Sequence, residues 1–176
     1  FRYQMLTLAW ILENNNYYTC FFNGGNAVVG KAFQFDQGYD VYEMMSHHTD
    51  NAETVTDRFL SYLPQLKKSP FFAYIHFMDV HLPYKKNKYS TNLIDKAHEE
   101  TDIPYKDFKK MALFASYVRR SENKLTDISR RYIRSIYEKE VKFVDEHIGR
   151  IVARLKQEKL YDNTLLIITA DHGEEF

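Results

Sequence analysis

Three short apolar runs, each followed within two residues by a polar one, stand out in the hydrophobic pattern of the chain. They extend over residues 17–22, 71–77 and 165–168, and the first of them ends at an Asn-Gly-Gly-Asn sequence, residues 23–26. Runs of this length with little polar interruption are typical of strands that are buried on both faces. The pattern therefore predicts three strands, with a turn directly after the first.

Apolar residues at helical spacing lie between and beside these runs. A stripe over residues 55–66 follows a sequence that resembles a capping box, residues 50–53, and a longer stripe extends over residues 133–155. A shorter apolar group over residues 6–12 predicts a helix that stops at three asparagines, Asn14–Asn16. Alternating strands and helices predict an α/β fold, with a mostly parallel sheet and helices on both of its faces.

Length and composition narrow the picture. The 176 residues suit a single domain spanning 1–176, and the polar stretch 85–125 is interpreted as an excursion over an active-site rim, with one helix around residues 108–118. Because 24 basic residues balance 24 acidic ones, no global field favours nucleic acid or a charged membrane. No apolar run reaches the length of a membrane-spanning helix. A single cysteine, Cys20, excludes a disulfide within the chain and is interpreted as a small buried apolar residue.

Residues capable of site chemistry follow two of the predicted strands. Asp171, His172 and Gly173 come after the last run, and Asp79 and His81 come after residues 71–77. Hard oxygen and borderline nitrogen donors at the carboxyl end of a strand are typical of a metal site. The alternative is that these residues only form capped turns. Asp79 has two open interpretations, supporting His81 or capping its turn.

Both strand ends carry a family resemblance. The segments "PFFAYIHFMDVHLPY" and "LYDNTLLIITADHGEEF" resemble, in this order, motifs of the sulfatases of the alkaline phosphatase superfamily. The resemblance implies an alkaline phosphatase/sulfatase-like fold in which Asp171 and His172 bind a divalent metal ion. Calcium is the expected ion, and manganese, magnesium and zinc are alternatives. His81 falls on the histidine that contacts the ester, which makes it the catalytic and substrate-binding candidate.

Two parts of the chain depart from the family pattern. Sulfatases mature a cysteine or serine in a Cys/Ser-x-Pro-x-Arg motif into the nucleophile, whereas Cys20 lies in "YYTCFFNGG" without such a motif. We therefore expect an excised part of a longer enzyme that is inactive alone. A loop at residues 23–31, "NGGNAVVGK", replaces a family segment whose lysine and histidine hold the anion, and is similar to loops of the phosphoglycerol transferase branch. Lys31 is the candidate to substitute for that missing cation.

The sequence thus predicts part of a metal-dependent hydrolase that acts on sulfate esters, small-molecule or glycan. Three alternatives stay open: a phosphoester hydrolase or phosphoglycerol transferase of the same superfamily, a non-catalytic sulfatase-like binding domain, and a metal-free α/β domain. The sequence predicts no nucleic-acid partner and leaves the oligomeric state and the compartment undecided.

Overall fold

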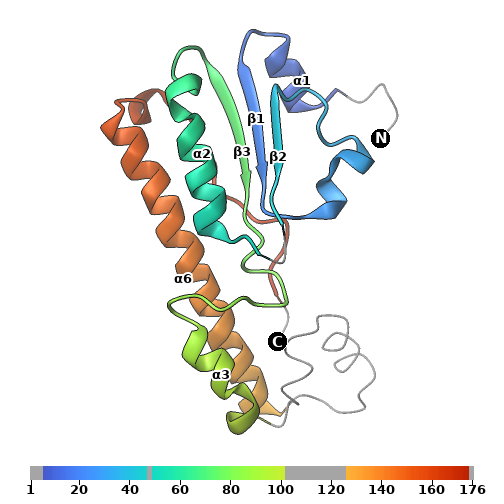
Figure 1. Cartoon of the computed structure of the whole chain (residues 1–176), viewed down its shortest axis with the longest axis vertical. Coiled ribbons are helices and arrows are strands. Elements are labelled where there is room, and N and C mark those ends of the chain that lie inside the picture. The colour runs from blue at the N-terminus through green and yellow to red at the C-terminus, as the bar shows by residue number, and fades with distance from the viewer. Residues whose placement is uncertain (1–5, 47–48, 102–125, 175–176) are drawn as a thin grey trace. The chain divides into compact units, whose positions relative to one another are not determined.

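The computed structural model describes residues 6–46, 49–101 and 126–174 (Figure 1). The chain divides into two compact units, residues 1–78 with 147–164 and residues 79–146 with 165–176. One long helix, α6 (Asp127–Gln157), contributes its first part to the second unit and its last part to the first unit. Each unit is therefore described by itself, and the single domain expected over 1–176 stays a prediction.

A three-stranded parallel sheet forms the centre of the first unit. Its strands are β1 (Tyr18–Asn23), β2 (Val41–Met44) and β3 (Phe71–His76), in the order β2-β1-β3. Cys20 lies opposite Val41 on one side and opposite Ala73 on the other. The α/β class and the parallel sheet are thus confirmed, as are the predicted strands β1 and β3. Sequence analysis did not predict β2.

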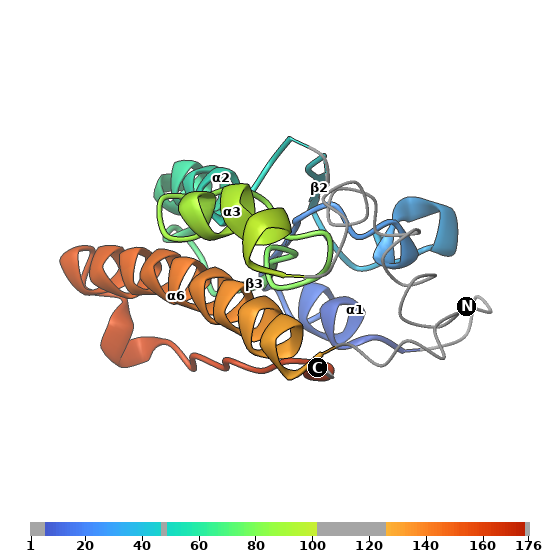
Figure 2. The ribbon, with the colours of Figure 1, turned by 90° about the horizontal axis from the view of Figure 1, so that it is seen from below.

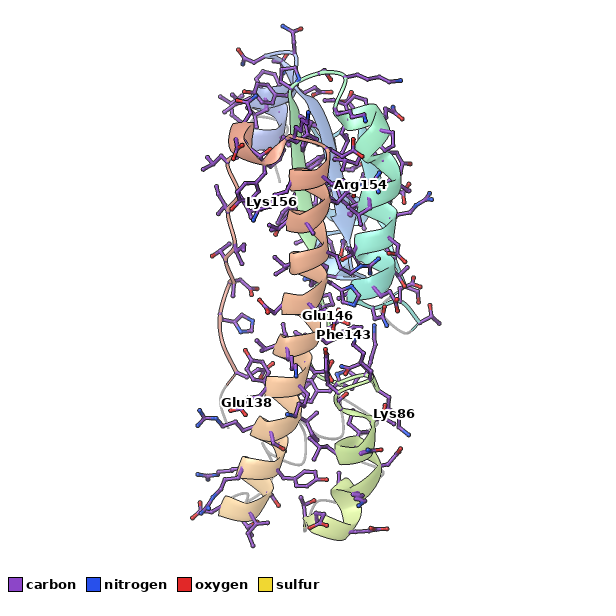
Figure 3. The ribbon with its side chains drawn as sticks, turned by 90° about the vertical axis from the view of Figure 1, so that its left-hand side faces the viewer. Lys86, Glu138, Phe143, Glu146, Arg154 and Lys156 are labelled. Atoms are coloured by element: carbon purple, nitrogen blue, oxygen red, sulfur yellow. The ribbon has the colours of Figure 1, made fainter. Side chains whose placement is uncertain are left out.

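Two helices cover one face of this sheet. Helix α2 (Ala52–Leu66) begins after Asn51, whose side chain accepts a hydrogen bond from the Thr54 N–H, one residue later than the predicted cap. The last part of α6 lies beside it (Figure 3). Between the helices and the sheet lies an apolar core that includes Cys20, Phe22, Val55, Phe59, Leu63, Leu66, Ile151 and Leu155.

Aromatic rings and a short helix lie on the opposite face. The Phe21 ring contacts the rings of Tyr39, Tyr42 and Tyr74 at centroid distances of 5.4, 5.0 and 4.5 Å. Helix α1 (Leu8–Glu13) lies on the other side of the strands from α2 in two views (Figures 1 and 2). The loop before β2 passes close to α1: a Cβ on Gly38 would lie 2.3 Å from the backbone nitrogen of Trp10. Helices therefore flank both faces, as the sequence predicts.

The remaining short elements of the first unit lie in two connections. Between β1 and β2 the chain forms two 3₁₀ turns, η1 (Ala27–Val29) and η2 (Lys31–Phe33). After α6 it forms a third one, η3 (Tyr161–Asn163). No helix in the described part of the chain is long and apolar enough to cross a membrane.

The second unit is built on helix α3 (Thr91–Glu100) and the first part of α6. Its small core contains Tyr84, Ile94, Ala97, Ile133 and Ile136. Helix α3 lies inside the stretch 85–125, which we had interpreted mainly as a surface excursion. The helix expected around residues 108–118 lies outside the described residues.

The strand predicted over residues 165–168 is wrong. This segment joins none of the three strands of the described sheet, and Leu165, Ile167 and Ile168 are 87, 72 and 64% exposed. A parallel strand needs backbone partners beside it and cover on its faces. Hydrophobicity shows what a segment would bury, but not whether a neighbouring strand is present to bury it.

Candidate functional site

A closed turn follows β1 at the carboxyl edge of the sheet. Asn23 is fully buried, and its Oδ1 accepts hydrogen bonds from the N–H groups of Gly25 (3.0 Å) and Asn26 (2.8 Å). Its Nδ2 donates to the Asn26 carbonyl at 2.9 Å and to the Tyr42 hydroxyl at 3.0 Å. The side-chain amide of Asn23 is thus used within the turn and its surroundings, which fixes the turn against β2.

Gly24 joins the same turn to the end of β3. Its N–H donates to the His76 carbonyl at 2.8 Å, and a Cβ at this position would lie 2.6 Å from that oxygen. Only glycine allows this close approach of two backbones. The predicted turn at residues 23–26 is therefore confirmed and tied to both neighbouring strands.

Lys31 lies further along this connection, at the start of η2. Its side chain is exposed, and its Nζ lies 5.6 Å from the centroid of the Tyr42 ring, in a cation–π contact. Lys31 belongs to the first unit, whereas His81, Asp171 and His172 belong to the second. Its role as an anion contact stays a prediction.

His81 occupies the turn that follows β3 in sequence. Its ring is partly buried, and its Nδ1 lies 2.6 Å from the Leu82 carbonyl oxygen. Because a carbonyl can only accept a hydrogen bond, the proton is assigned to Nδ1 and the lone pair to Nε2. The peptide bond that follows, Leu82–Pro83, is cis. In this tautomer Nε2 is the ring nitrogen that can accept a hydrogen bond.

Asp171 and His172 form an adjacent donor pair. The Asp171 Oδ1 accepts from the His172 backbone N–H at 3.0 Å, and the Asp171 Oδ2 lies 3.8 Å from His172 Nε2. His172 Nδ1 lies 2.7 Å from the Gly173 carbonyl, and this hydrogen bond, with the Asp171 charge, raises the pKa of the imidazole. Both side chains are largely exposed, at 84 and 65%. An oxygen and a nitrogen donor thus lie side by side.

This pair has the chemistry of a divalent-metal site but not a full ligand set. Carboxylate oxygen and imidazole nitrogen suit calcium, manganese and zinc to different degrees. No group of three histidine, cysteine or acidic side chains suited to a metal occurs among residues 6–46, 49–101 and 126–174. The residues present therefore fit part of a metal site, and Glu175, the last acidic residue of the motif, lies outside the described residues.

Tyr84 links the two sequence motifs. Burial raises the pKa of its hydroxyl, and the carboxylate of Glu174 raises it further, followed by Tyr137 and Glu140. Glu174 and Tyr84 are therefore within electrostatic reach of each other in the second unit. The turn that carries His81 and the segment that carries Asp171 thus belong to one compact unit, although the strand expected before Asp171 is absent.

Glu140 is a buried acidic residue that sequence analysis missed. It is 0% exposed on α6, and its carboxyl pKa is raised to about 7, mainly by burial. Its Oε2 accepts from Asn87 Nδ2 at 2.8 Å. A signal was present, because Glu140 follows Ile136 by four residues and precedes Phe143 by three, on the apolar face of the helix.

Basic residues near this site are paired with acids. Lys86 forms an ion pair with Asp95, and Lys88 pairs with Glu146 of α6 at 2.6 Å. The Tyr89 hydroxyl donates to the same Glu146 carboxylate at 2.6 Å. These lysines therefore anchor the segment before α3 through ion pairs, which reduces the positive charge that they present to an anion.

A parallel α/β sheet agrees with the fold of the alkaline phosphatase superfamily, whose motifs the His-x-Pro-Tyr turn and the Asp-His pair resemble. The family model for sulfatases matches residues 3–176, and the chain belongs to the sulfatase family. No curated protein and no solved structure gave a significant match. Membership of the family confirms the resemblance and indicates hydrolase chemistry in general.

Proposed function

We propose that this chain is part of a metal-dependent hydrolase that cleaves sulfate esters of small molecules or glycans. The observation that carries the proposal is the match of the sulfatase family model to residues 3–176, which include both the turn that holds His81 and the segment that holds Asp171. The charge of Glu174 also acts on the Tyr84 hydroxyl, three residues after His81. An ester bound between that turn and that segment would meet an acid–base histidine on one side and metal ligands on the other.

Asp171 and His172 are proposed as metal ligands. A bound divalent ion would neutralise the anionic ester and lower the pKa of the nucleophile. Calcium suits the carboxylate, while the imidazole makes the donor set softer and thereby favours manganese or zinc. Magnesium is the remaining alternative. The Nδ1 hydrogen bond of His172 to the Gly173 carbonyl orients the ring and leaves Nε2 as the metal-binding atom.

His81 is proposed to contact the ester and to protonate its leaving oxygen. Its Nδ1 donates to the Leu82 carbonyl, which orients the ring, so that Nε2 is the nitrogen that would take up a proton and pass it to the leaving oxygen. Lys31 is proposed as a second anion contact, from the connection after β1. The only cysteine, Cys20, is buried in β1 and lacks a nucleophile motif, so it is not proposed as the nucleophile.

A phosphate ester is the second candidate substrate, and one observation favours it. Asn23 and Gly24 fix a closed loop where many sulfatases carry a lysine and a histidine. A phosphoester hydrolase or phosphoglycerol transferase of the same superfamily is therefore the alternative. Turnover of an aryl sulfate against an aryl phosphate by the intact enzyme separates the two. A protein that binds either ester without turnover would be a non-catalytic binding domain.

Two substitutions in the intact enzyme test the assigned roles. Asp171→Ala should abolish bound metal and activity together, because a carboxylate ligand is lost. His81→Ala should keep the metal while lowering turnover about a hundredfold or more, the usual size of a lost proton donor. Elemental analysis and turnover are measured for each variant. Loss of metal in His81→Ala would make His81 a ligand, and full activity in both variants would refute the hydrolase site.

A further inference from the structure

The buried carboxyl group of Glu140 is surrounded by residues of the segment that carries His81. Asn87 Nδ2 donates to its Oε2 at 2.8 Å, and Ser90 lies beside the carboxyl group. The charges of Asp79 and Lys85 act on it as well, in opposite directions. All four residues lie between positions 79 and 90, on both sides of His81 in sequence, so this segment folds around one side chain of α6.

Asn87 closes this segment on itself. Its Oδ1 accepts hydrogen bonds from the N–H groups of Tyr89 at 2.8 Å and Ser90 at 3.1 Å. The Ser90 hydroxyl accepts from the Asn87 N–H at 3.2 Å and donates to the Lys85 carbonyl at 3.2 Å. The Asn87 side chain thus shapes the turn before α3 with its oxygen. With its nitrogen it attaches the same turn to α6.

This arrangement is costly for stability. Glu140 Oε1 and the Tyr84 hydroxyl are both buried and form no hydrogen bond among the described residues. A buried carboxyl group with one unsatisfied oxygen destabilises a fold, and an apolar side chain of similar size is often neutral or better. The burial of Glu140 is therefore poorly explained by stability alone.

We propose that Glu140 is a positioning residue for His81, which it fixes by holding the segment 79–90 on α6 through Asn87. The inference rests on the proposed function only for the catalytic role of His81. Breaking the hydrogen bond between Glu140 and Asn87 should change the orientation of the His81 ring. This effect does not depend on any reaction. Misplacing a reacting group by about 1 Å lowers turnover by about a hundredfold.

Two substitutions break this link from opposite ends. Glu140→Leu removes the acceptor and fills the space with an apolar side chain. Asn87→Asp keeps an oxygen for the Tyr89 and Ser90 N–H groups but removes the donor. Glu140→Gln is the conservative variant, because its amide oxygen can still accept from Asn87.

The matched control is Glu138→Gln on the same helix. Glu138 is 61% exposed and pairs with Arg134 at 3.2 Å. Figure 3 shows it directed away from the side of α6 on which Lys86 lies. A change of charge on α6 is thus tested without touching the segment 79–90.

The first measurement is the imidazole ¹H–¹⁵N spectrum of His81, assigned by its absence in His81→Ala. We expect Glu140→Leu and Asn87→Asp to move the His81 nitrogen signals away from the Nδ1–H tautomer, and Glu140→Gln and Glu138→Gln to leave them in place. The second measurement is turnover by the intact enzyme, with thermal stability alongside. Glu140→Leu and Asn87→Asp should lower kcat about a hundredfold with a much smaller change in KM, and Glu140→Gln should restore most of it.

The two hypotheses fail in different ways. An inactive wild-type enzyme would refute the proposed function, while the His81 spectrum would still decide the positioning role. Unchanged His81 signals in a folded Glu140→Leu or Asn87→Asp protein would overturn the inference. A fall in kcat that follows thermal stability in all variants, with no rescue by Glu140→Gln, would also overturn it, because that pattern indicates a purely structural residue.

Discussion

Cys20 illustrates how far burial alone determines the chemistry of a residue. Its side chain is 0% exposed in β1, between the sheet and α2, and burial raises the pKa of the thiol to about 12, with a smaller contribution from Asp40. Because the thiolate is the reactive form, a thiol with this pKa is inert at neutral pH. The sequence-based interpretation of Cys20 as a buried apolar residue agrees with this position.

The first prediction concerns the reactivity of this thiol. In the folded chain, Cys20 should react with a disulfide reagent such as DTNB at pH 8 at least about a hundredfold more slowly than in denaturant, because both access and ionisation are suppressed. The absorbance of the released thiolate gives the rate. Equal rates in the two conditions would show that β1 opens readily.

The second prediction follows from the raised pKa of Glu140. Folding raises the pKa of this carboxyl from 4.5 to about 7, so the folded state binds the proton more tightly than the unfolded state. The stability from Glu140 is therefore fully present below pH 4.5 and is lost as the pH rises towards 7. Relative to Glu140→Gln, the free energy of unfolding should fall by up to about 3 kcal/mol over this range, then level off. Urea unfolding of both proteins at several pH values measures it, and parallel curves would contradict the assignment.

At the scale of elements, apolar periodicity predicted the helices that bury one face and leave the other exposed. The apolar stripes of α2 and α6 were predicted because both helices bury one face, α2 and the last part of α6 against the sheet and the first part of α6 in the core with α3. Strand β2 was missed because Val41–Met44 is short and includes Glu43, which pairs with Arg58 at the surface. Helix α3 was missed because it is polar, and its start depends on the side chain of Asn87.

The third prediction concerns the start of α2. Asn51 caps this helix by accepting from the Thr54 N–H at 3.2 Å, so Asn51→Ala should lower the free energy of unfolding by about 1 kcal/mol. Asn51→Asp is the matched control, since its carboxylate can also accept this hydrogen bond. Chemical denaturation monitored by circular dichroism is the measurement. A loss of equal size in both variants would exclude capping as the cause.

At the scale of the whole molecule, the roles of the site residues stay predictions, whereas the structure around them can be compared with the sequence. The motifs at His81 and Asp171 belong to the same compact unit, as a shared site requires. The segment before Asp171 pairs with none of the strands in the described sheet and therefore forms no strand. A hydrophobic pattern cannot predict this, because it does not show whether a partner strand lies beside the segment. The roles of Glu140 and Asn87 could not be predicted from sequence patterns, because they depend on contacts between residues that are far apart in sequence.

The exposed segment after η3 has a consequence for behaviour at high concentration. Residues 164–169 are apolar or threonine, without charge or proline, and four of their side chains are 38–87% exposed. Uncharged windows rich in β-branched residues add copies of themselves edge to edge and start cross-β aggregates. Ile167→Lys should therefore slow the growth of light scattering in concentrated solution while leaving the unfolding midpoint nearly unchanged, since Ile167 buries little surface. Equal scattering by both proteins would place the aggregation-prone surface elsewhere on the chain.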